Sequence, residues 1–282
     1  MPECGARNRT GAGGQLFQPA QPEPTLQGDT RPAFRNWAEI RDRLKAATAW
    51  AFFLDVDGTL VRLRHRPSDV RMPRAARSVL KRLAAHPHVV VTIVTGRRLA
   101  DVRALVGLEG LRYFGVHGGE SEQGLAILGE DSRAVLEDAR RSVRLFLGGI
   151  PGIWIEDKSI SIAVHYRNAR AAAIETAAQN LARLAGRWEG VLHILNGSRV
   201  WEILPQEIRG KSAAVAAVLK QSGRGVSAVY IGNDGTDEVA FAALPDEITV
   251  RVGRSPRTLA RFFVPTPADV LRLLERMEKE LP

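Results

Sequence analysis

Two aspartates follow an apolar run in the segment FFLDVDGTL, which spans residues 52–60. The run predicts a short buried strand, and because side chains alternate along a strand, Asp55 and Asp57 share one face at its carboxyl end. Carboxylates this close repel each other unless a cation or a proton lies between them. A Mg²⁺ ion, which prefers hard oxygen ligands, would relieve the repulsion. The alternative is a strand that ends in an Asp-Gly turn, with Asp57 serving only the turn.

Three later segments carry groups that phosphoryl transfer needs, since that reaction depends mainly on positioning and on charge neutralisation. Thr95 follows the apolar run at 89–94 and offers a hydroxyl and a backbone N–H near a helix start, where anions bind. Lys211 opens an expected helix and brings an ammonium toward the same anion. The loop GNDGTDE at 232–238 would complete a metal site. The plainer alternatives are a helix cap for Thr95 and a solvated surface lysine for Lys211. For the loop, the alternative is a helix capped by Thr236, with Asp237 and Glu238 favouring its dipole.

The elements expected around these groups alternate between strands and helices. Strands are predicted at 50–55, 89–94, 111–116, 226–231 and 248–252, and helices at 37–47, 74–85, 98–106, 211–221 and 267–281. Such alternation predicts an α/β fold with a doubly wound parallel sheet. The carboxyl ends of its strands meet at one edge, where open sheets of this kind carry their reactive groups.

The pattern changes in the middle of the chain. A helix at 133–147 is followed by strands at 153–158 and 159–167, a helix at 169–185, and strands at 191–195 and 200–204. This order predicts an α+β module on an antiparallel sheet, inserted into the first domain. We therefore expect a core of residues 36–120 and 206–282 and an inserted domain of residues 121–205. Residues 1–35 are rich in Gly, Pro, Gln and Arg without an apolar period, so we expect a disordered tail there.

The composition narrows the cellular setting and the partners. Cys4 is the only cysteine among 282 residues, so no internal disulfide is possible and a reducing compartment fits. No secretory signal or membrane span is expected, which favours the cytoplasm. The net charge of +9 comes from arginines scattered through nearly every segment. A nucleic-acid binder concentrates such charge in a patch, so we expect no nucleic-acid partner and interpret the charge as favouring a phosphate-bearing substrate.

The segment DVDGTL resembles the nucleophile motif of the haloacid dehalogenase (HAD) superfamily of phosphotransferases. The order of the aspartate pair, Thr95, Lys211 and the acidic loop is similar to the four motifs of that superfamily. The resemblance implies a HAD-like core in which Asp55 is the nucleophile and Asp57 the general acid and base. It further implies phosphate binding by Thr95, Gly96 and Lys211.

The resemblance also implies a Mg²⁺ ion held by Asp55, Asp57 and the acidic loop. One position departs from the pattern, because the last motif usually opens Gly-Asp and the matching residue here is Asn233. An amide oxygen can ligate a hard cation but brings no charge. Asp234, next in the chain, is the candidate to replace the missing carboxylate, directly or through a water. We expect weaker Mg²⁺ binding as a result.

The inserted segment resembles the cap domain of the trehalose-6-phosphate phosphatases. The similarity lies in EDKSISIAVHYR at 156–167, GVHGGE at 115–120 and RVWEILP at 199–205. The loop at 232–238 is close to that family's Gly-Asp-Asp-x-Thr-Asp-Glu, and the whole resemblance covers about residues 50–275. It implies sugar-binding roles for four cap residues: Glu156, Lys158, Arg167 and Glu202.

These side chains suit a sugar, since carboxylates accept hydrogen bonds from hydroxyls and the cations donate them. The alternative is an exposed ladder of cross-strand ion pairs, which contributes little energy. Arg97 and His117 are further candidates for contact with the substrate. His117 fits a structural histidine equally well, because it ends a predicted strand just before two glycines.

The resemblance thus implies a Mg²⁺-dependent phosphatase that hydrolyses trehalose 6-phosphate to trehalose and phosphate through an aspartyl-phosphate. The cap would close over the disaccharide and select it. Two alternatives stay open. One is a phosphatase for another sugar phosphate, such as sucrose phosphate or mannosyl-phosphoglycerate. The other is a weakly active or non-catalytic sugar-phosphate-binding homologue, which the departure from the motif at Asn233 leaves open. An association with a trehalose-phosphate synthase is a further expectation.

Overall fold

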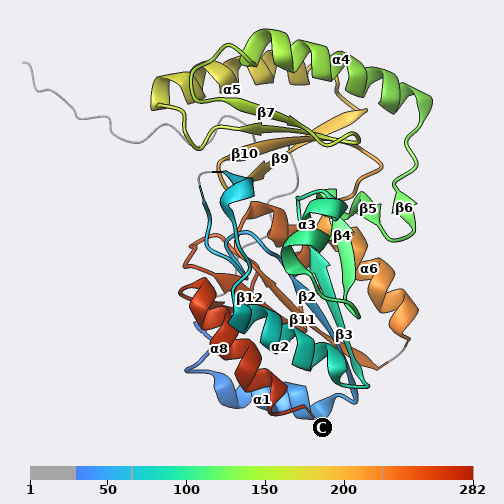
Figure 1. The fold of residues 1–282 in the computed structure, drawn as a ribbon, viewed down its shortest axis with the longest axis vertical. Helices are drawn as coiled ribbons and strands as arrows, with labels where there is room; N and C mark the ends of the chain where they lie inside the picture. Colours follow the sequence, from blue (N-terminus) through green and yellow to red (C-terminus); the bar gives the residue numbers. More distant parts are fainter. Residues whose placement is uncertain (1–29, 65, 224, 282) are drawn as a thin grey trace, which may run out of the picture.

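The computed structural model describes residues 30–64, 66–223 and 225–281, which form two β-sheets with helices around them (Figure 1). The larger sheet has nine strands in the order β1 (Arg31–Pro32), β13 (Phe262–Val264), β12 (Ile248–Val252), β11 (Val226–Gly232), β2 (Ala49–Leu54), β3 (Val89–Val94), β4 (Arg112–Gly115), β5 (Glu120–Ser121) and β6 (Gly124–Leu125). Neighbours from β1 to β4 pair in parallel, and β5 and β6 pair antiparallel at the edge.

The central strand β2 is apolar throughout because both of its faces are covered. Phe52 and Leu54 pack toward helices α1 (Trp37–Ala46), α2 (Arg74–Ala85), α3 (Leu99–Val106) and α8 (Pro267–Glu278). Ala51 and Phe53 pack on the opposite face, toward α6 (Lys211–Ser222) and α7 (Glu238–Ala242). A strand buried on both faces has no polar alternation, as is typical of parallel sheets. The predicted doubly wound α/β core is confirmed.

The cap contains the smaller sheet, with the antiparallel order β7 (Trp154–Asp157), β8 (Ile162–His165), β10 (Val200–Pro205) and β9 (Leu192–Gly197). Helices α4 (Glu130–Leu147) and α5 (Ala171–Ala185) cover the face of this sheet that is turned away from the larger sheet (Figure 1). Their apolar side chains form a second core with the sheet, separate from the first. The uncovered face of the cap sheet is therefore turned toward the carboxyl edge of the larger sheet.

The structure corrects the expected start of the first domain. Residues 1–29 lie outside the described residues, but Arg31 and Pro32 form β1 and pair in parallel with Phe262 and Phe263. Ala33 is fully buried against the main core. The expected tail of residues 1–35 is therefore wrong for residues 30–35, which are ordered and of which Arg31 and Pro32 belong to the sheet.

Several short elements of the structure were not predicted from the sequence. They are β1, β13, the hairpin of β5 and β6, and the single turns η1 (Pro67–Asp69), η2 (Val116–Gly118) and η3 (Gly235–Asp237). The hairpin extends the larger sheet past residue 120, where the inserted domain was expected to begin. No helix in the described part of the chain is both long and apolar enough to span a bilayer.

Candidate active site

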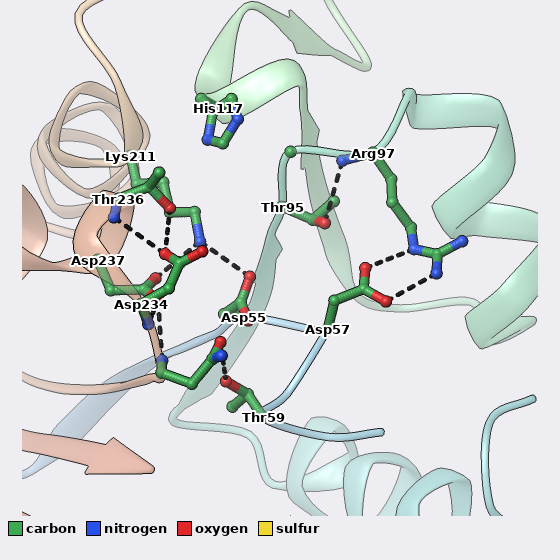
Figure 2. A network of polar contacts seen from close by, with 12 residues as sticks. Asp55, Asp57, Thr59, Thr95, Arg97, His117, Lys211, Asp234, Thr236 and Asp237 are labelled. Atoms are coloured by element: carbon green, nitrogen blue, oxygen red, sulfur yellow. Dashed lines mark hydrogen bonds and ion pairs between the residues drawn. The ribbon is translucent and has the colours of Figure 1, made fainter. Parts of the chain in front are cut away.

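Asp55 directly follows β2 and is a buried carboxylate with a buried cation beside it. Its backbone N–H donates to the Ile231 carbonyl at 3.0 Å, so the hydrogen bonding with β11 continues one residue past the end of β2. The Asp55 Oδ1 accepts a hydrogen bond from Lys211 Nζ at 2.8 Å, and the same ammonium donates to Asp237 Oδ1 at 2.7 Å (Figure 2). Lys211 thus lies between two carboxylates at the start of α6. The surface-lysine alternative is excluded, because the side chain is almost fully buried.

Asp237 is the buried partner of Lys211, a role that was not predicted from the sequence. Its Oδ1 also accepts from the Tyr230 hydroxyl at 2.8 Å, and its Oδ2 accepts from the backbone N–H groups of Asn233 and Asp234 at 2.9 and 3.1 Å. A Cβ on Gly232 would lie 2.3 Å from the Asp237 carboxyl carbon, so only glycine leaves room for it. The sequence contains no signal that separates Asp237 from its neighbours in the acidic loop.

Burial and charge shift the ionisation of this cluster. Burial raises the pKa of Asp55 to about 8, and the Asp237 carboxylate adds to the rise while the Lys211 ammonium opposes it. Burial alone would also raise the pKa of Asp237, but the Lys211 ammonium outweighs burial, and the pKa of that carboxyl is lowered. The pKa of Lys211 is raised, because the two carboxylates overcome its own burial. The ammonium is therefore firmly charged, and Asp237 is its principal counter-ion.

Asp57 is held by an arginine from the loop after β3. Arg97 Nε donates to Asp57 Oδ2 at 2.6 Å and Nη2 donates to Oδ1 at 2.7 Å, which is a two-point contact (Figure 2). The same loop is shaped by Thr95, whose Oγ1 accepts from the Arg97 backbone N–H at 3.2 Å. Arg97 was expected to contact the substrate, and the structure shows it on Asp57.

A group of oxygens surrounds the Asn233 side chain. The hydrogen-bonding pattern turns its amide nitrogen toward the Asp57 main-chain oxygen at 2.9 Å, Asp55 Oδ2 at 3.1 Å and Thr59 Oγ1 at 3.3 Å. Gly58 makes this approach possible, because a Cβ there would lie 2.3 Å from the nearest atom of the Asn233 amide group. Asn233 thus reaches Asp55 and Asp57 as the expected metal site requires, and Thr59 joins them.

Asp234 is engaged differently. Its Oδ1 accepts from the Thr236 N–H and hydroxyl at 2.9 and 2.6 Å, which caps η3, and its Oδ2 accepts from the Ser198 N–H of the cap at 3.2 Å. A helix cap is therefore present in the acidic loop, but the capping residue is Asp234 and not the expected Thr236. In the described part of the chain no group of three or more His, Cys, Asp or Glu side chains is placed to hold a metal ion.

The cap contributes a second ion cluster, close to the first. Lys158 Nζ donates to Glu202 Oε1 at 2.6 Å and to the Gly96 main-chain carbonyl at 2.9 Å. Burial alone would raise the pKa of Glu202, but the Lys158 ammonium outweighs it and the pKa falls to about 2. Glu156 Oε2 lies 2.9 Å from His165 Nε2 and 3.9 Å from Lys158 Nζ. These residues are therefore not an exposed ion-pair ladder, since Lys158 and Glu202 are buried.

His117 lies beside this cluster in a strained backbone conformation, with φ of 55°. Its Nε2 is 3.6 Å from Glu202 Oε1, and a Cβ on Gly96 would lie 2.7 Å from the same ring atom. Neither ring nitrogen makes a hydrogen bond within the described part of the chain, although the side chain is buried. Arg167 Nη2 donates to the Ser198 carbonyl at 2.6 Å.

One cavity of about 1160 Å³ joins the core and cap residues. Its lining includes every expected site residue except Asn233: Asp55, Asp57, Thr95, Gly96, Arg97, His117, Glu156, Lys158, Arg167, Glu202, Lys211 and Asp234. The sheet edge supplies carboxylates, a hydroxyl and a buried ammonium, which suit an attack on a phosphoryl group. The cap supplies carboxylates and cations, which suit a polyhydroxylated partner.

Comparisons with known proteins agree with this arrangement. Residues 53–263 match the family model described as trehalose-phosphatase. The trehalose-phosphate phosphatase of Mycobacterium marinum is 33% identical over 273 residues, which cover 89% of this chain and 69% of that protein. The protein of the same name from Mycolicibacterium paratuberculosis is 35% identical over 277 residues, with 89% and 70% covered. The C-terminal domain of the Candida albicans trehalose-6-phosphate phosphatase superposes with a TM-score of 0.77 at 19% identity, over 90% of this chain and 99% of that one.

Proposed function

This chain belongs to the trehalose-phosphatase family, and from that premise we propose that it hydrolyses trehalose 6-phosphate to trehalose and phosphate. The observation that carries the proposal is the single cavity in which Asp55 and Lys211 face the cap residues Glu156 and Arg167. A phosphoryl group at the sheet edge and a sugar against the cap would together occupy this space. The substrate is a small molecule, and neither a nucleic acid nor a membrane is needed for this function.

Asp55 acts as the nucleophile in the mechanism that we propose. One of its carboxylate oxygens attacks the phosphorus, the bond from phosphorus to the sugar oxygen breaks, and an aspartyl-phosphate forms on Asp55. Lys211, the Thr95 hydroxyl and the Gly96 N–H stabilise the charge on the phosphoryl oxygens. A water then attacks the phosphorus, phosphate leaves and the Asp55 carboxylate is restored.

Asp57 moves the protons in both steps. It donates a proton to the departing sugar oxygen, and it later accepts one from the attacking water. The two-point contact with Arg97 occupies both of its oxygens in the present arrangement. Asp57 can therefore act only after Arg97 has shifted, and a bound phosphoryl group or sugar hydroxyl offers the guanidinium another acceptor.

The oxygens around Asn233 fit a Mg²⁺ ion, because all of them are hard ligands. Asp55 Oδ2, the Asp57 main-chain oxygen and the Asn233 side-chain oxygen would hold it, once the amide has turned its oxygen toward the cation. When bound, Mg²⁺ supplies positive charge against the phosphoryl oxygens. Asp234 is a weaker candidate ligand, since its carboxylate already caps η3 and receives the Ser198 N–H.

Phosphate release from a panel of sugar phosphates, with and without Mg²⁺, tests the proposal. We expect trehalose 6-phosphate to be the best substrate, ahead of sucrose 6-phosphate, mannosyl-phosphoglycerate and glucose 6-phosphate. Chelation should abolish turnover, and Asp55→Asn should reduce it to a trace. Sustained turnover by Asp55→Asn would exclude the covalent mechanism, and a flat panel would exclude trehalose 6-phosphate as the specific substrate.

Asn233 also supports a second candidate, a sugar-phosphate-binding homologue with little or no catalytic activity. Its amide brings no negative charge to the cation site, and it satisfies the surrounding oxygens without a cation. Calorimetric binding of trehalose 6-phosphate without phosphate release in saturating Mg²⁺ would support this alternative. The association with a trehalose-phosphate synthase and the cytoplasmic location stay predictions.

A further inference from the structure

Trp154 is an exception among the five tryptophans of the chain. Trp37, Trp50, Trp188 and Trp201 are between 1% and 7% exposed, whereas Trp154 is 50% exposed. Its side chain lies on β7 of the cap and lines the cavity that also contains Asp55. An indole left half in water forgoes much of the stabilising free energy of its burial, since tryptophan has one of the largest apolar side-chain surfaces. The position therefore points to a ligand that covers the ring.

The strand order of the cap sheet fixes how far Trp154 lies from the end of the cavity beside the acidic loop. Its register forms one row across the four strands, in the order Trp154, His165, Val200 and Gly197. All four line the cavity. Gly197 lies beside the acidic loop, because a Cβ on it would be 3.4 Å from Asp234 Oδ2. Three strand spacings separate the two ends of the row, which is about 14 Å. The span leaves room for a second sugar ring beyond the ring that carries the phosphate.

The indole is held in a defined orientation. It stacks on the His165 ring with centroids 4.5 Å apart and an angle of 24° between the planes. His165 is itself fixed by Glu156, whose Oε2 lies 2.9 Å from its Nε2. Because His165 covers one face of the indole, the exposed surface lies mainly on the other face and the edges. A ring fixed in advance loses little conformational entropy when a ligand packs on it.

The groups around this open surface suit a pyranose ring. A pyranose presents an apolar C–H face together with hydroxyls at its rim, and ligand sites combine aromatic walls with a few polar groups in the same way. Glu156 follows Trp154 by two residues and therefore shares its face of β7, where its carboxylate can accept from a hydroxyl. Arg167, which also lines the cavity, offers donors. A phosphoryl dianion, by contrast, gains nothing from an apolar ring.

We propose that Trp154 is the platform for the sugar ring that does not carry the phosphate, and that it sets the preference for disaccharide over monosaccharide phosphates. This inference rests on the proposed function, since that function supplies the second ring. Trp154→Ala should raise KM for trehalose 6-phosphate about ten-fold with little change in kcat, because the ring lies far from the phosphorus. Turnover of glucose 6-phosphate should change less than about two-fold, and Trp154→Phe should recover much of the loss.

Phe146→Ala is the matched control, because Phe146 is an equally exposed aromatic side chain that does not line the cavity. It should leave both substrates unaffected. The proposed role of Trp154 is wrong if the wild type prefers trehalose 6-phosphate to glucose 6-phosphate and Trp154→Ala keeps the same ratio of kcat/KM between these two substrates.

Acrylamide quenching of tryptophan fluorescence tests the contact without catalysis. Trp154 is the accessible tryptophan of the wild type, so trehalose should protect its emission from acrylamide, and Trp154→Phe should show neither the quenching nor the protection. Mannitol, an open-chain polyol, should protect neither protein. Unchanged quenching at trehalose concentrations that calorimetry shows to be saturating would overturn the platform. If no sugar phosphate is hydrolysed at all, the proposed function fails, and this measurement still decides whether Trp154 binds sugar.

Discussion

Lys158 of the cap donates a hydrogen bond from Nζ to the main-chain carbonyl of Gly96, at 2.9 Å. Gly96 lies in the core loop that also carries Thr95 and Arg97, and Lys158 is paired at the same time with Glu202. A buried ammonium therefore ties the cap to the loop that we expect to bind phosphate. Lys158 thus has a structural role in addition to the sugar contact that the family resemblance implies.

Removing this ammonium should destabilise the chain strongly. Lys158→Met leaves the buried Glu202 carboxylate without a cation, and such a loss costs about 3–5 kcal/mol of unfolding free energy. Urea unfolding followed by circular dichroism measures the change, and Lys220→Met, at an exposed position of α6, is the control. The double variant Lys158→Met/Glu202→Leu should recover part of the loss, because neither charge then remains. A loss below about 1 kcal/mol for Lys158→Met would contradict the importance of this pair.

The same pair predicts a defined acid sensitivity. The pKa of Glu202 is about 2 in the folded chain and 4.5 ordinarily. Because the folded value is the lower one, the carboxylate contributes stability above pH 4.5, and the contribution is lost as the pH falls toward 2. The full difference corresponds to about 3 kcal/mol. The gap in unfolding free energy between wild type and Glu202→Gln should therefore shrink between about pH 6 and about pH 3. An equal gap at both ends would exclude the shift.

The elements that position Asp55 were predictable from sequence because their signals are local. β2 is a continuous apolar run and β3 is a run of β-branched residues, and each is followed directly by a polar residue. A parallel sheet brings such strand ends to one edge. The cap was predictable for the same reason, since its strands and long helices carry clear periods. β1 and β13 were missed because each spans two or three residues and their pairing joins segments more than two hundred residues apart.

The pairings within the site were beyond sequence reasoning for a physical reason. Arg97 reaches Asp57, and Lys158 reaches Gly96, only because tertiary packing brings two loops together. Asp237 and Glu238 are chemically alike and adjacent, yet one is the buried partner of Lys211 and the other pairs with Arg251. Their different roles follow from the direction in which the loop turns after β11, and composition does not encode that direction.

The contact between Asp57 and Arg97 predicts a dependence on the leaving group. Asp57→Asn removes the proton donor, so turnover of a sugar phosphate should fall by roughly 10²–10⁴. In the first turnover an aryl phosphate should lose much less, because its phenolate departs without a proton. The later hydrolysis of the aspartyl-phosphate lacks its base with either substrate. Arg97→Lys keeps the charge but loses the two-point geometry, and we expect a smaller loss with the same substrate dependence. Arg98→Lys, at a more exposed neighbour, is the control.

Burst kinetics, which follow release of the leaving group in the first turnover, distinguish these outcomes on both substrates. Equal losses of the first-turnover rate on the sugar and aryl phosphates would mean that Asp57 positions the site and does not donate the proton to the leaving group.

Asn233 leads to the prediction that best separates the two candidate functions. In the present arrangement its amide nitrogen faces Asp55 Oδ2 and the Asp57 main-chain oxygen, so a cation must displace those hydrogen bonds before it binds. Asn233→Asp replaces the amide by a carboxylate, which repels Asp55 without a cation and attracts Mg²⁺ when one is present. We therefore expect a lower Tm without metal, a larger rise in Tm on adding Mg²⁺, and about ten-fold tighter binding.

Calorimetry with Mg²⁺ and electron paramagnetic resonance with Mn²⁺ measure this binding without reference to turnover. Asp234→Asn is the matched control, because it changes the neighbouring carboxylate that caps η3; it should lower Tm and leave the metal affinity nearly unchanged. If Asn233→Asp binds Mg²⁺ no more tightly than the wild type, the cation is held elsewhere. If Asn233→Asp binds Mg²⁺ more tightly and gains phosphatase activity that the wild type lacks, the wild-type chain is a sugar-phosphate-binding protein. Its Asn233 amide would then block cation binding by its own hydrogen bonds.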